Sequence, residues 1–180
     1  MTRDRGDRAG QCALKDKLAE FHRDAFVWAL NCCRHNRDDA EDILQATYLK
    51  ILEGRARFDG RSSFITWLFA VVRLTAVDHR RRHFLRNLLA ARWVDEESNR
   101  LPAPGADSAT ESAQRCTVMK DALASLPMRQ REVLLLVFYH EFSIEDAARV
   151  MAVSVGSARQ HYARGKRALR TKLTDRRAEL

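Results

Sequence analysis

The sequence predicts an all-α fold: two small helical domains joined by a flexible acidic linker, the C-terminal one containing a helix-turn-helix. Apolar residues recur every three or four positions in several segments, which is the spacing of one helix face. Glycine and proline are scarce, at 7 and 3 of 180 residues, and no strand pattern recurs. Between two basic regions, residues 91–111 gather carboxylates and prolines, as linkers do. We therefore expect domains over 12–90 and 112–175.

The overall charge favours a polyanionic partner. Lysine and arginine number 32 against 24 aspartates and glutamates, for a formal net charge of +8. Such an excess is typical of proteins that bind nucleic acid. The chain holds no apolar run long enough to cross a membrane, and its first ten residues lack the apolar core of a secretory signal. We expect a cytoplasmic protein that inserts into no membrane.

The N-terminal domain is expected to begin with two helices, after a charged, disordered lead-in over 1–11. An apolar stripe from Leu14 to Cys32 predicts one helix from Ala13 to about residue 35. A second helix follows over 39–54, in the stretch DAEDILQATYLKILEG, with its N-cap supplied by residues 37–39 and Gly54 as its C-cap. Five polar residues are left on the outer face of this helix: Asp39, Glu41, Asp42, Gln45 and Lys50.

A long helix over 64–89 completes this domain and combines apolar with basic side chains. Its apolar positions give a core-facing side, whereas Arg73 and the run 80–82 do not fit a core. Phe58 and Phe64 flank the loop before it, beside several arginines. A positive groove with aromatic platforms suits single-stranded nucleic acid, because unpaired bases can stack on the rings.

The C-terminal domain is predicted to hold two further helices before the helix-turn-helix. The first covers 112–124, and a turn at 125–127 separates it from the second, over 129–139. Helical spacing predicts four buried side chains in the second: Val133, Leu134, Val137 and Phe138. The tail after Thr174 is expected to fray.

The stretch from 143 to 170 has the pattern of a helix-turn-helix. Ser143 can cap the first helix, with Asp146 placed three residues on, as in a capping box. Ala152 occupies the turn position at which glycine is favoured. In such a motif the second helix contacts base edges, with arginine suited to guanine and glutamine to adenine. An αα-hairpin with a solvated basic face is the alternative.

Three stretches, in this order and spacing, closely resemble bacterial RNA polymerase sigma factors of the extracytoplasmic-function (ECF) class. DAEDILQATYLKIL resembles the helix that binds core polymerase, and FDGRSSFITWLFAVVRLTAVDHRRR resembles the promoter-melting loop and helix. LPMRQREVLLLVFYHEFSIEDAARVMAVSVGSARQHYARGKRALR resembles the C-terminal helix-turn-helix domain. The resemblance covers nearly the whole chain.

This resemblance implies roles for particular residues. Contacts to core polymerase are expected from Asp39, Glu41, Asp42, Gln45 and Lys50. Contacts to the minus-ten element are expected from Phe58, Arg61, Ser62, Phe64, Arg73, Leu74, Arg80 and Arg81. Contacts to the minus-thirty-five element are expected from Ser157, Arg159, Gln160, Ala163, Arg164 and Arg167. Leu74 stands where the family often has asparagine, and Ala46 where it usually has glutamate.

The resemblance also implies partners and a function. The expected partners are the polymerase core (through its clamp helices and flap), promoter DNA and an anti-sigma factor. The expected function is to direct core polymerase to promoters and to help open the DNA, with no catalysis, cofactor or metal of its own. A stand-alone helix-turn-helix regulator is the alternative. A third hypothesis, a redox or metal sensor built on Cys32, Cys33 and His35, lacks the fourth ligand that a zinc site needs.

Overall fold

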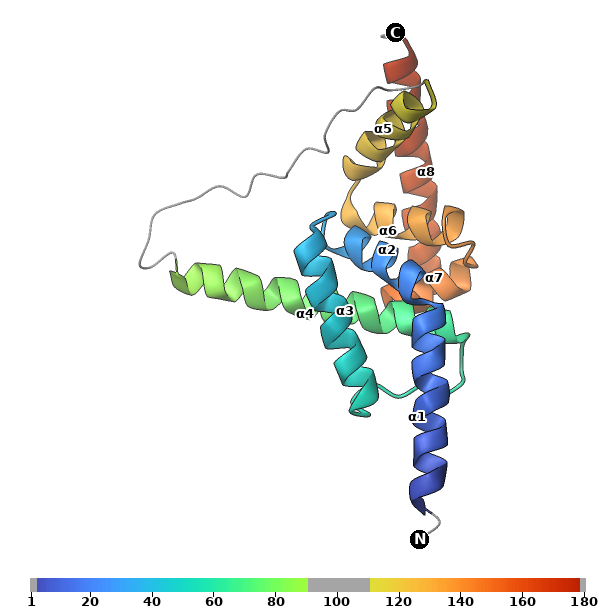
Figure 1. The fold of residues 1–180 in the computed structure, drawn as a ribbon. Coiled ribbons are helices and arrows are strands. Elements are labelled where there is room, and N and C mark those ends of the chain that lie inside the picture. The colour runs from blue at the N-terminus through green and yellow to red at the C-terminus, as the bar shows by residue number, and fades with distance from the viewer. Residues whose placement is uncertain (1–2, 91–110, 179–180) are drawn as a thin grey trace. The chain divides into compact units, whose positions relative to one another are not determined.

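The computed structural model describes residues 3–90 and 111–178, and these form helices without any strand (Figure 1). The chain divides into two units, residues 1–96 and 97–180. The helices of the first unit are α1 (Arg3–Glu20), α2 (His22–Cys32), α3 (Arg37–Leu52) and α4 (Phe64–Ala90). Those of the second are α5 (Glu111–Ala124), α6 (Met128–Phe138), α7 (Ile144–Met151) and α8 (Val155–Ala178). The predicted all-α class with two helical domains is confirmed. The predicted linker lies outside the described residues apart from Glu111, where α5 begins.

The single helix predicted from Ala13 to residue 35 is wrong, because the chain forms two helices that meet at Phe21. Phe21 has φ −95° and ψ 10°, which turns the chain between α1 and α2. Its ring lies 5.9 Å from that of Phe64. A disordered lead-in over 1–11 is also wrong from Arg3 onward, since α1 begins there. Extending a helix that already exists costs far less than starting one.

The core of the first unit forms where α2, α3 and α4 pack against one another. Trp28 of α2 is fully buried and stacks on Phe69 of α4, with ring centroids 5.5 Å apart. Its indole Nε1 donates a hydrogen bond of 3.1 Å to the Phe69 carbonyl. Ile43 and Leu44 supply the buried side of α3. The stacked pair therefore fixes α2 against α4 both by packing and by a directional bond.

The ends of α3 show which capping predictions hold. Asn36 is the N-cap, because its side chain accepts a hydrogen bond of 3.2 Å from the Asp39 N–H, so the predicted cap at 37–39 is wrong. An asparagine just outside the helix can adopt extended backbone geometry, as Asn36 does at ψ 118°. The C-cap of α3 is Glu53, so the predicted C-cap at Gly54 is one residue too late; Gly54 follows it with φ +70°, the left-handed conformation that glycine adopts readily just past a helix end.

The second unit packs α6 and α7 against α8, with α5 along the same helix. Its buried side chains include Leu126, Val133, Leu134, Leu136 and Met151. Burial of Phe138 was predicted from spacing and is wrong, because its side chain is 61% exposed. Val137 is only half-buried, and the fully buried residue near this end of α6 is Leu136.

The prediction that the tail frays after Thr174 is wrong, because α8 continues to Ala178.

No helix within the described ranges is long and apolar enough to cross a membrane.

Candidate nucleic-acid interface

A left-handed turn at Ala152 joins α7 to α8. Ala152 has φ 52° and ψ 50°, a conformation that glycine adopts more readily than alanine. Ser154 then opens α8, since its Oγ accepts a hydrogen bond of 3.1 Å from the Ser157 N–H. The two serine hydroxyls also lie 2.9 Å apart. The predicted helix-turn-helix, including the demand it places on Ala152, is confirmed.

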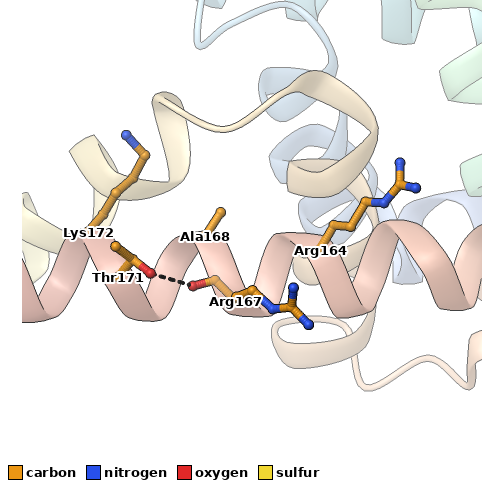
Figure 2. Close-up of a pocket in the computed structure, with 5 residues that line it drawn as sticks. All are labelled: Arg164, Arg167, Ala168, Thr171 and Lys172. Atoms are coloured by element: carbon orange, nitrogen blue, oxygen red, sulfur yellow. Dashed lines mark hydrogen bonds between the residues drawn. The ribbon is translucent and has the colours of Figure 1, made fainter.

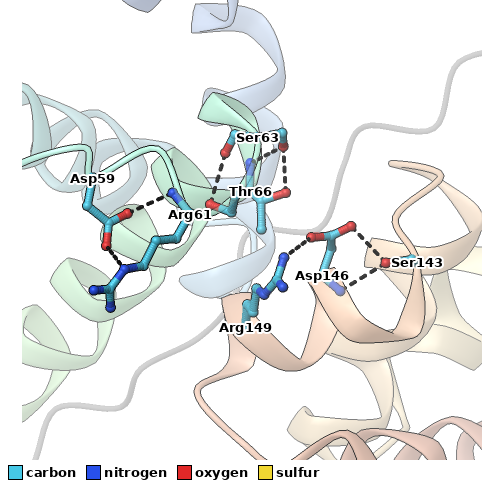
Figure 3. Close-up of polar contacts among 8 residues, drawn as sticks. Asp59, Arg61, Ser63, Thr66, Ser143, Asp146 and Arg149 are labelled. Carbon is cyan, nitrogen blue, oxygen red and sulfur yellow. Dashed lines mark hydrogen bonds and ion pairs between the residues drawn. The ribbon is translucent and has the colours of Figure 1, made fainter.

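The short helix α7 is held in place at both ends. Ser143 accepts from the Asp146 N–H at 3.0 Å and donates its hydroxyl to Asp146 Oδ2 at 2.7 Å, which confirms the predicted cap (Figure 3). Arg149 completes this group by pairing with Asp146 Oδ1 at 3.2 Å. At the other end, Arg129 of α6 donates to the Met151 carbonyl at 3.0 Å. These contacts fix the position of α7 within the motif.

One face of α8 is pinned against α6. Gly165 is buried there, and a Cβ at this position would lie 3.1 Å from Gln130 Cβ and 3.2 Å from a Leu134 methyl. Ala158 is also fully buried. Because this side of α8 is fixed, the opposite side is presented to solvent in a defined orientation.

The residues predicted to contact the minus-thirty-five element lie on the solvent side of α8, with one exception. Five of the six are exposed: Arg159, Gln160, Ala163, Arg164 and Arg167. Ser157 is half-buried and its hydroxyl faces that of Ser154, so it serves the cap. The exposed set follows the three- and four-residue spacing of one helix face. The structure therefore forms a continuous polar and basic row on α8.

The row continues into a shallow hollow of about 440 Å³ on the second half of α8 (Figure 2). The lining residues are Arg164, Arg167, Ala168, Thr171 and Lys172. Thr171 donates its hydroxyl to the Arg167 carbonyl at 3.3 Å, which holds this side chain along the helix. With three cationic side chains around an open hollow, this surface can accept the phosphates of a nucleic acid backbone.

In the first unit, the loop before α4 presents Phe58 and Arg61. Asp59 Oδ1 accepts from the Arg61 N–H at 3.1 Å, and Asp59 Oδ2 lies 3.4 Å from Arg61 Nε (Figure 3). The Arg61 side chain is 88% exposed. Ser63 starts α4 by accepting from the Thr66 N–H at 3.2 Å. A short, internally bonded turn therefore carries an exposed guanidinium.

The aromatic residues of this loop form one cluster. The rings of Phe58 and Phe64 are 5.5 Å apart, and Phe64 lies 5.3 Å from Trp67. Phe64 is only 9% exposed and Lys17 of α1 sits 5.5 Å above its ring, so Phe64 supports the loop from within. Phe58 is 38% exposed and is the member of the cluster that a ligand can reach most easily. Ser62, in the same loop, is half-buried.

Along α4, the predicted minus-ten residues separate into buried and exposed side chains. Arg73 is only 6% exposed, so the expectation that it does not fit the core is wrong. A charged side chain can be buried when partners satisfy it, and Arg73 has such interactions. Leu74 is 60% exposed, and Arg80 and Arg81 are exposed. The exposed positions, and not Arg73, are available to a ligand.

The predicted polymerase-binding residues of α3 mostly face solvent. Glu41, Asp42 and Gln45 are exposed and Asp39 is half-exposed. Glu41 pairs with Arg37 one turn earlier, at 3.0 Å.

Lys50 differs from the other four because it turns toward α4. Its ammonium donates to Thr75 Oγ1 at 3.1 Å and lies 3.5 Å from Asp78 Oδ2. Its side chain is 23% exposed. Its placement on the outer face of α3 is therefore wrong, because two polar groups on the neighbouring helix attract it. Lys50 fastens α3 to α4.

A second shallow hollow, of about 530 Å³, joins α3 to the far half of α4. Asp42 lines it together with His79, Arg82, Leu85 and Arg86. The sequence prediction did not assign the four α4 residues to any site. The three- and four-residue spacing of His79, Arg82 and Arg86 could have indicated that they share one face with Leu85 beside them.

The cysteines give no geometric support to the sensor hypothesis. The Cys33 thiol donates to the Ala29 carbonyl at 2.8 Å, and burial raises the pKa of Cys33 to about 12, with Asp39 adding to the rise. A thiol with so high a pKa is a poor nucleophile and a poor metal ligand. Cys32 is buried, and the described residues include no group of three metal-ligating side chains.

Comparison with known proteins decides the family. Residues 18–84 match the family description Sigma-70 region 2, and residues 117–169 match Sigma-70, region 4. The chain is 34% identical over 132 residues to the ECF RNA polymerase sigma factor SigF of Caulobacter vibrioides, covering 73% of this chain and 69% of that protein. It is 34% identical over 145 residues to SigC of Mycobacterium tuberculosis, covering 79% and 75%. The chain belongs to the ECF sigma factors of RNA polymerase.

As an ECF sigma factor, the protein directs RNA polymerase to promoters. The fold agrees with that of a solved relative: RpoE, in complex with the anti-sigma factor NepR from Bartonella quintana, superimposes with a TM-score of 0.69. That match has 25% sequence identity and covers 90% of this chain and 97% of RpoE. The region 2 match lies within the first unit and the region 4 match within the second. Each unit of this sigma factor therefore carries one of the two family regions.

Proposed function

We propose that this sigma factor uses three separate surfaces, one for core polymerase and two for promoter DNA. The outer face of α3 binds the polymerase clamp helices, and the second unit binds the flap. The loop before α4, with the exposed part of α4, captures and helps open the minus-ten element. The solvent face of α8 binds the minus-thirty-five element. The observation that carries this proposal is the exposed polar row on α8, which starts at a capped helix end.

The α8 surface suits the major groove in both length and chemistry. Arg159 and Gln160 lie in the first turns, where a recognition helix meets base edges. Arg164 and Arg167 lie roughly one and two turns further on and fit phosphate contacts. A substitution that removes one of these phosphate contacts should lower the slope of log affinity against log salt concentration by about 1.

This proposal is tested by selecting bound sequences from a randomised promoter library with the chain on core polymerase. Gln160→Ala should relax the preference at one base position, by about five- to 150-fold. Lys172→Ala, in the same helix but beyond the proposed base contacts, should keep every preference and change only the salt slope. Equal relaxation by both substitutions would contradict the assignment.

For the minus-ten element, the proposal rests on Phe58 and Arg61. The ring of Phe58 is exposed and packs against Phe64. Arg61 pairs with Asp59, and the side chain of Arg61 is the more exposed of the two. An unpaired base that stacks on Phe58 offsets part of the unstacking cost of melting, which is a few kcal/mol. Phe64 then acts as the support of the platform. Leu74, Arg80 and Arg81 contact the DNA along α4.

Permanganate footprinting of promoter complexes tests this part, because it detects unpaired thymines. Phe58→Ala should reduce melting at the minus-ten element by about tenfold, since one base stack contributes about 1–3 kcal/mol. Glu20→Ala, an exposed position on α1 outside the three proposed surfaces, serves as the control. Melting that is unaffected by Phe58→Ala would contradict a stacking role.

Core binding is assigned to Asp39, Glu41, Asp42 and Gln45, and Lys50 supports them by fastening α3 to α4. Asp42 also lines the hollow with basic side chains of α4, so this surface offers both signs of charge. The double substitution Asp42→Ala/Gln45→Ala should weaken binding to core polymerase by about tenfold or more, as expected when two central interface side chains are truncated. Glu20→Ala on α1 removes the same charge as Asp42→Ala and should bind as the wild type does.

We also propose an anti-sigma partner that covers polymerase-binding surfaces, as RpoE is solved with NepR. Exposed apolar side chains support this: Leu49 and Leu85 in the first unit, and Phe138 and Tyr139 in the second. A partner from the native host that blocks core binding is expected. Its binding should weaken when Leu49 and Leu85 are replaced by serine. An inhibitory partner that is indifferent to all four side chains would contradict this surface.

The proposed activity is regulatory and not enzymatic. The protein chooses where polymerase starts, the reaction itself belongs to the polymerase, and no cofactor is needed. Its place of action is the cytoplasm, where the polymerase acts. Purified chain that binds core and promoter in buffer treated with a chelator would support this, and loss of binding on chelation would contradict it.

A further inference from the structure

An ion pair ties the first helix of the helix-turn-helix to the proposed base-contacting end of the second. Arg159 Nη2 of α8 donates to Glu145 Oε1 of α7 at 3.0 Å. The two side chains are 68% and 52% exposed, so both remain accessible to a ligand. The bond spans 14 residues and links two separate helices.

This pair differs from the other charged contacts around it. Asp146 pairs with Arg149 and Ser143, all within the same helix region, so that group caps α7 and does not involve α8. Glu145 lies next to Asp146 in the first turn, where the helix dipole alone accounts for a carboxylate. The dipole does not account for a bond to α8. An isolated exposed ion pair adds little stability, so stability alone is a weak reason for it.

The chemistry of the guanidinium makes such a partner useful for base recognition. Arginine carries five N–H donors in a planar fork, and one bond to Glu145 leaves four of them. Recognition of guanine needs two parallel donors held in one plane toward O6 and N7. A long, free arginine side chain must lose rotamer freedom to reach that geometry, and it can equally turn to a phosphate. The carboxylate of Glu145, held on α7, limits both the rotamer freedom of Arg159 and its ability to turn to a phosphate.

We propose that Glu145 is a positioning residue that sets the base preference of Arg159. Its carboxylate holds the guanidinium in an orientation that favours guanine and disfavours nonspecific phosphate contact. This rests on the proposed function, in which Arg159 contacts the minus-thirty-five element. Glu145 touches no base in this account and acts only through Arg159.

The proposed role separates specificity from affinity. Without Glu145, Arg159 keeps its positive charge and gains freedom, so binding to phosphates is retained or increased. The discrimination between guanine and the other bases at one position is reduced. A merely structural role for Glu145 would instead weaken binding to every sequence alike.

The experiment uses the full chain on core polymerase and a randomised minus-thirty-five element. Arg159→Ala first identifies the base position whose preference depends on Arg159, by about five- to 150-fold. Glu145→Ala should lower the preference at that same position by about three- to tenfold, a part of that range, with unchanged or tighter binding to unrelated DNA. Glu145→Gln, which keeps an acceptor oxygen, should have a smaller effect. Asp146→Asn removes the same charge from the same helix turn, and it should leave the preference intact.

Coupling between the two residues completes the test. In the double variant, Glu145→Ala should have no further effect once Arg159 is alanine, because the proposed role acts only through that side chain. Unchanged preference in Glu145→Ala, an equal effect of Asp146→Asn, or additive effects in the double variant would each overturn the proposal. So would an altered preference at a second base position, which would mean that Glu145 contacts a base itself. If the wild-type chain shows no base preference at all, the proposed function fails instead.

Discussion

Replacing Ala152 by glycine should stabilise the second unit. Alanine in the left-handed region costs roughly 1–2 kcal/mol, and glycine removes that cost at φ 52° and ψ 50°. Glycine also gives the unfolded chain more freedom, which takes back about 0.4–1 kcal/mol. The net gain in the free energy of unfolding is about 0.8 kcal/mol, the difference between the middles of these two ranges. For a unit of this size, that gain corresponds to a rise in melting temperature of about 3–6 °C.

Calorimetry of the full chain measures this effect, since only the transition of the second unit should move. The matched control is Ala163→Gly, at an exposed position in the interior of α8. There the backbone is helical, so glycine should cost about 1 kcal/mol and lower the same transition. The two alanine-to-glycine changes are thus expected to act in opposite directions. If Ala152→Gly lowers the transition as Ala163→Gly does, the turn is not left-handed at Ala152 and the description of the motif is wrong.

Three further predictions concern the first unit. Trp28→Phe should destabilise it by about 2–4 kcal/mol in urea unfolding, because the smaller ring leaves a cavity and the hydrogen bond from the indole to the Phe69 carbonyl is lost. Arg73→Ala should cost about 3 kcal/mol of stability by removing a buried charge from its partners, yet leave promoter preference intact in the selected-library assay. Burial raises the pKa of the Cys33 thiol in the folded protein to about 12, from the ordinary value of 9.0 that applies in the unfolded chain. As the pH rises above about 9, the thiol ionises in the unfolded chain before it ionises in the folded one, so the protein loses stability between about pH 9 and about pH 12. Wild type should therefore lose more stability between about pH 8 and about pH 10.5 than Cys33→Ser, and an equal loss would contradict the burial of this thiol.

The sequence was informative wherever local chemistry decides the structure. Apolar spacing located most of the helices, and Ser143 with Asp146 marked the start of α7 correctly. The demand for positive φ at Ala152 followed from where the helical period broke. Most of the exposed row on α8 followed from the same period, because residues on one helix face share one environment.

The sequence was least informative where residues far apart in the chain decide the local structure. Nothing in the local pattern marks the break at Phe21, which contains neither glycine nor proline and whose ring instead reaches Phe64 of α4. Lys50 turns inward because Thr75 and Asp78 lie on a different helix. Arg73 looks like a surface arginine in sequence, and only the packed helices around it show that it is buried. These are tertiary effects that override local preference.

Run-off transcription with purified core polymerase measures whether the chain acts as a sigma factor. Templates selected from a promoter library should yield defined transcripts only when the chain is present. The transcript yield should fall by about tenfold or more with Asp42→Ala/Gln45→Ala, while Glu20→Ala should support transcription as the wild type does. The absence of any chain-dependent transcript, with salt-sensitive binding of the free chain to duplex DNA, would contradict a sigma factor that acts through core polymerase.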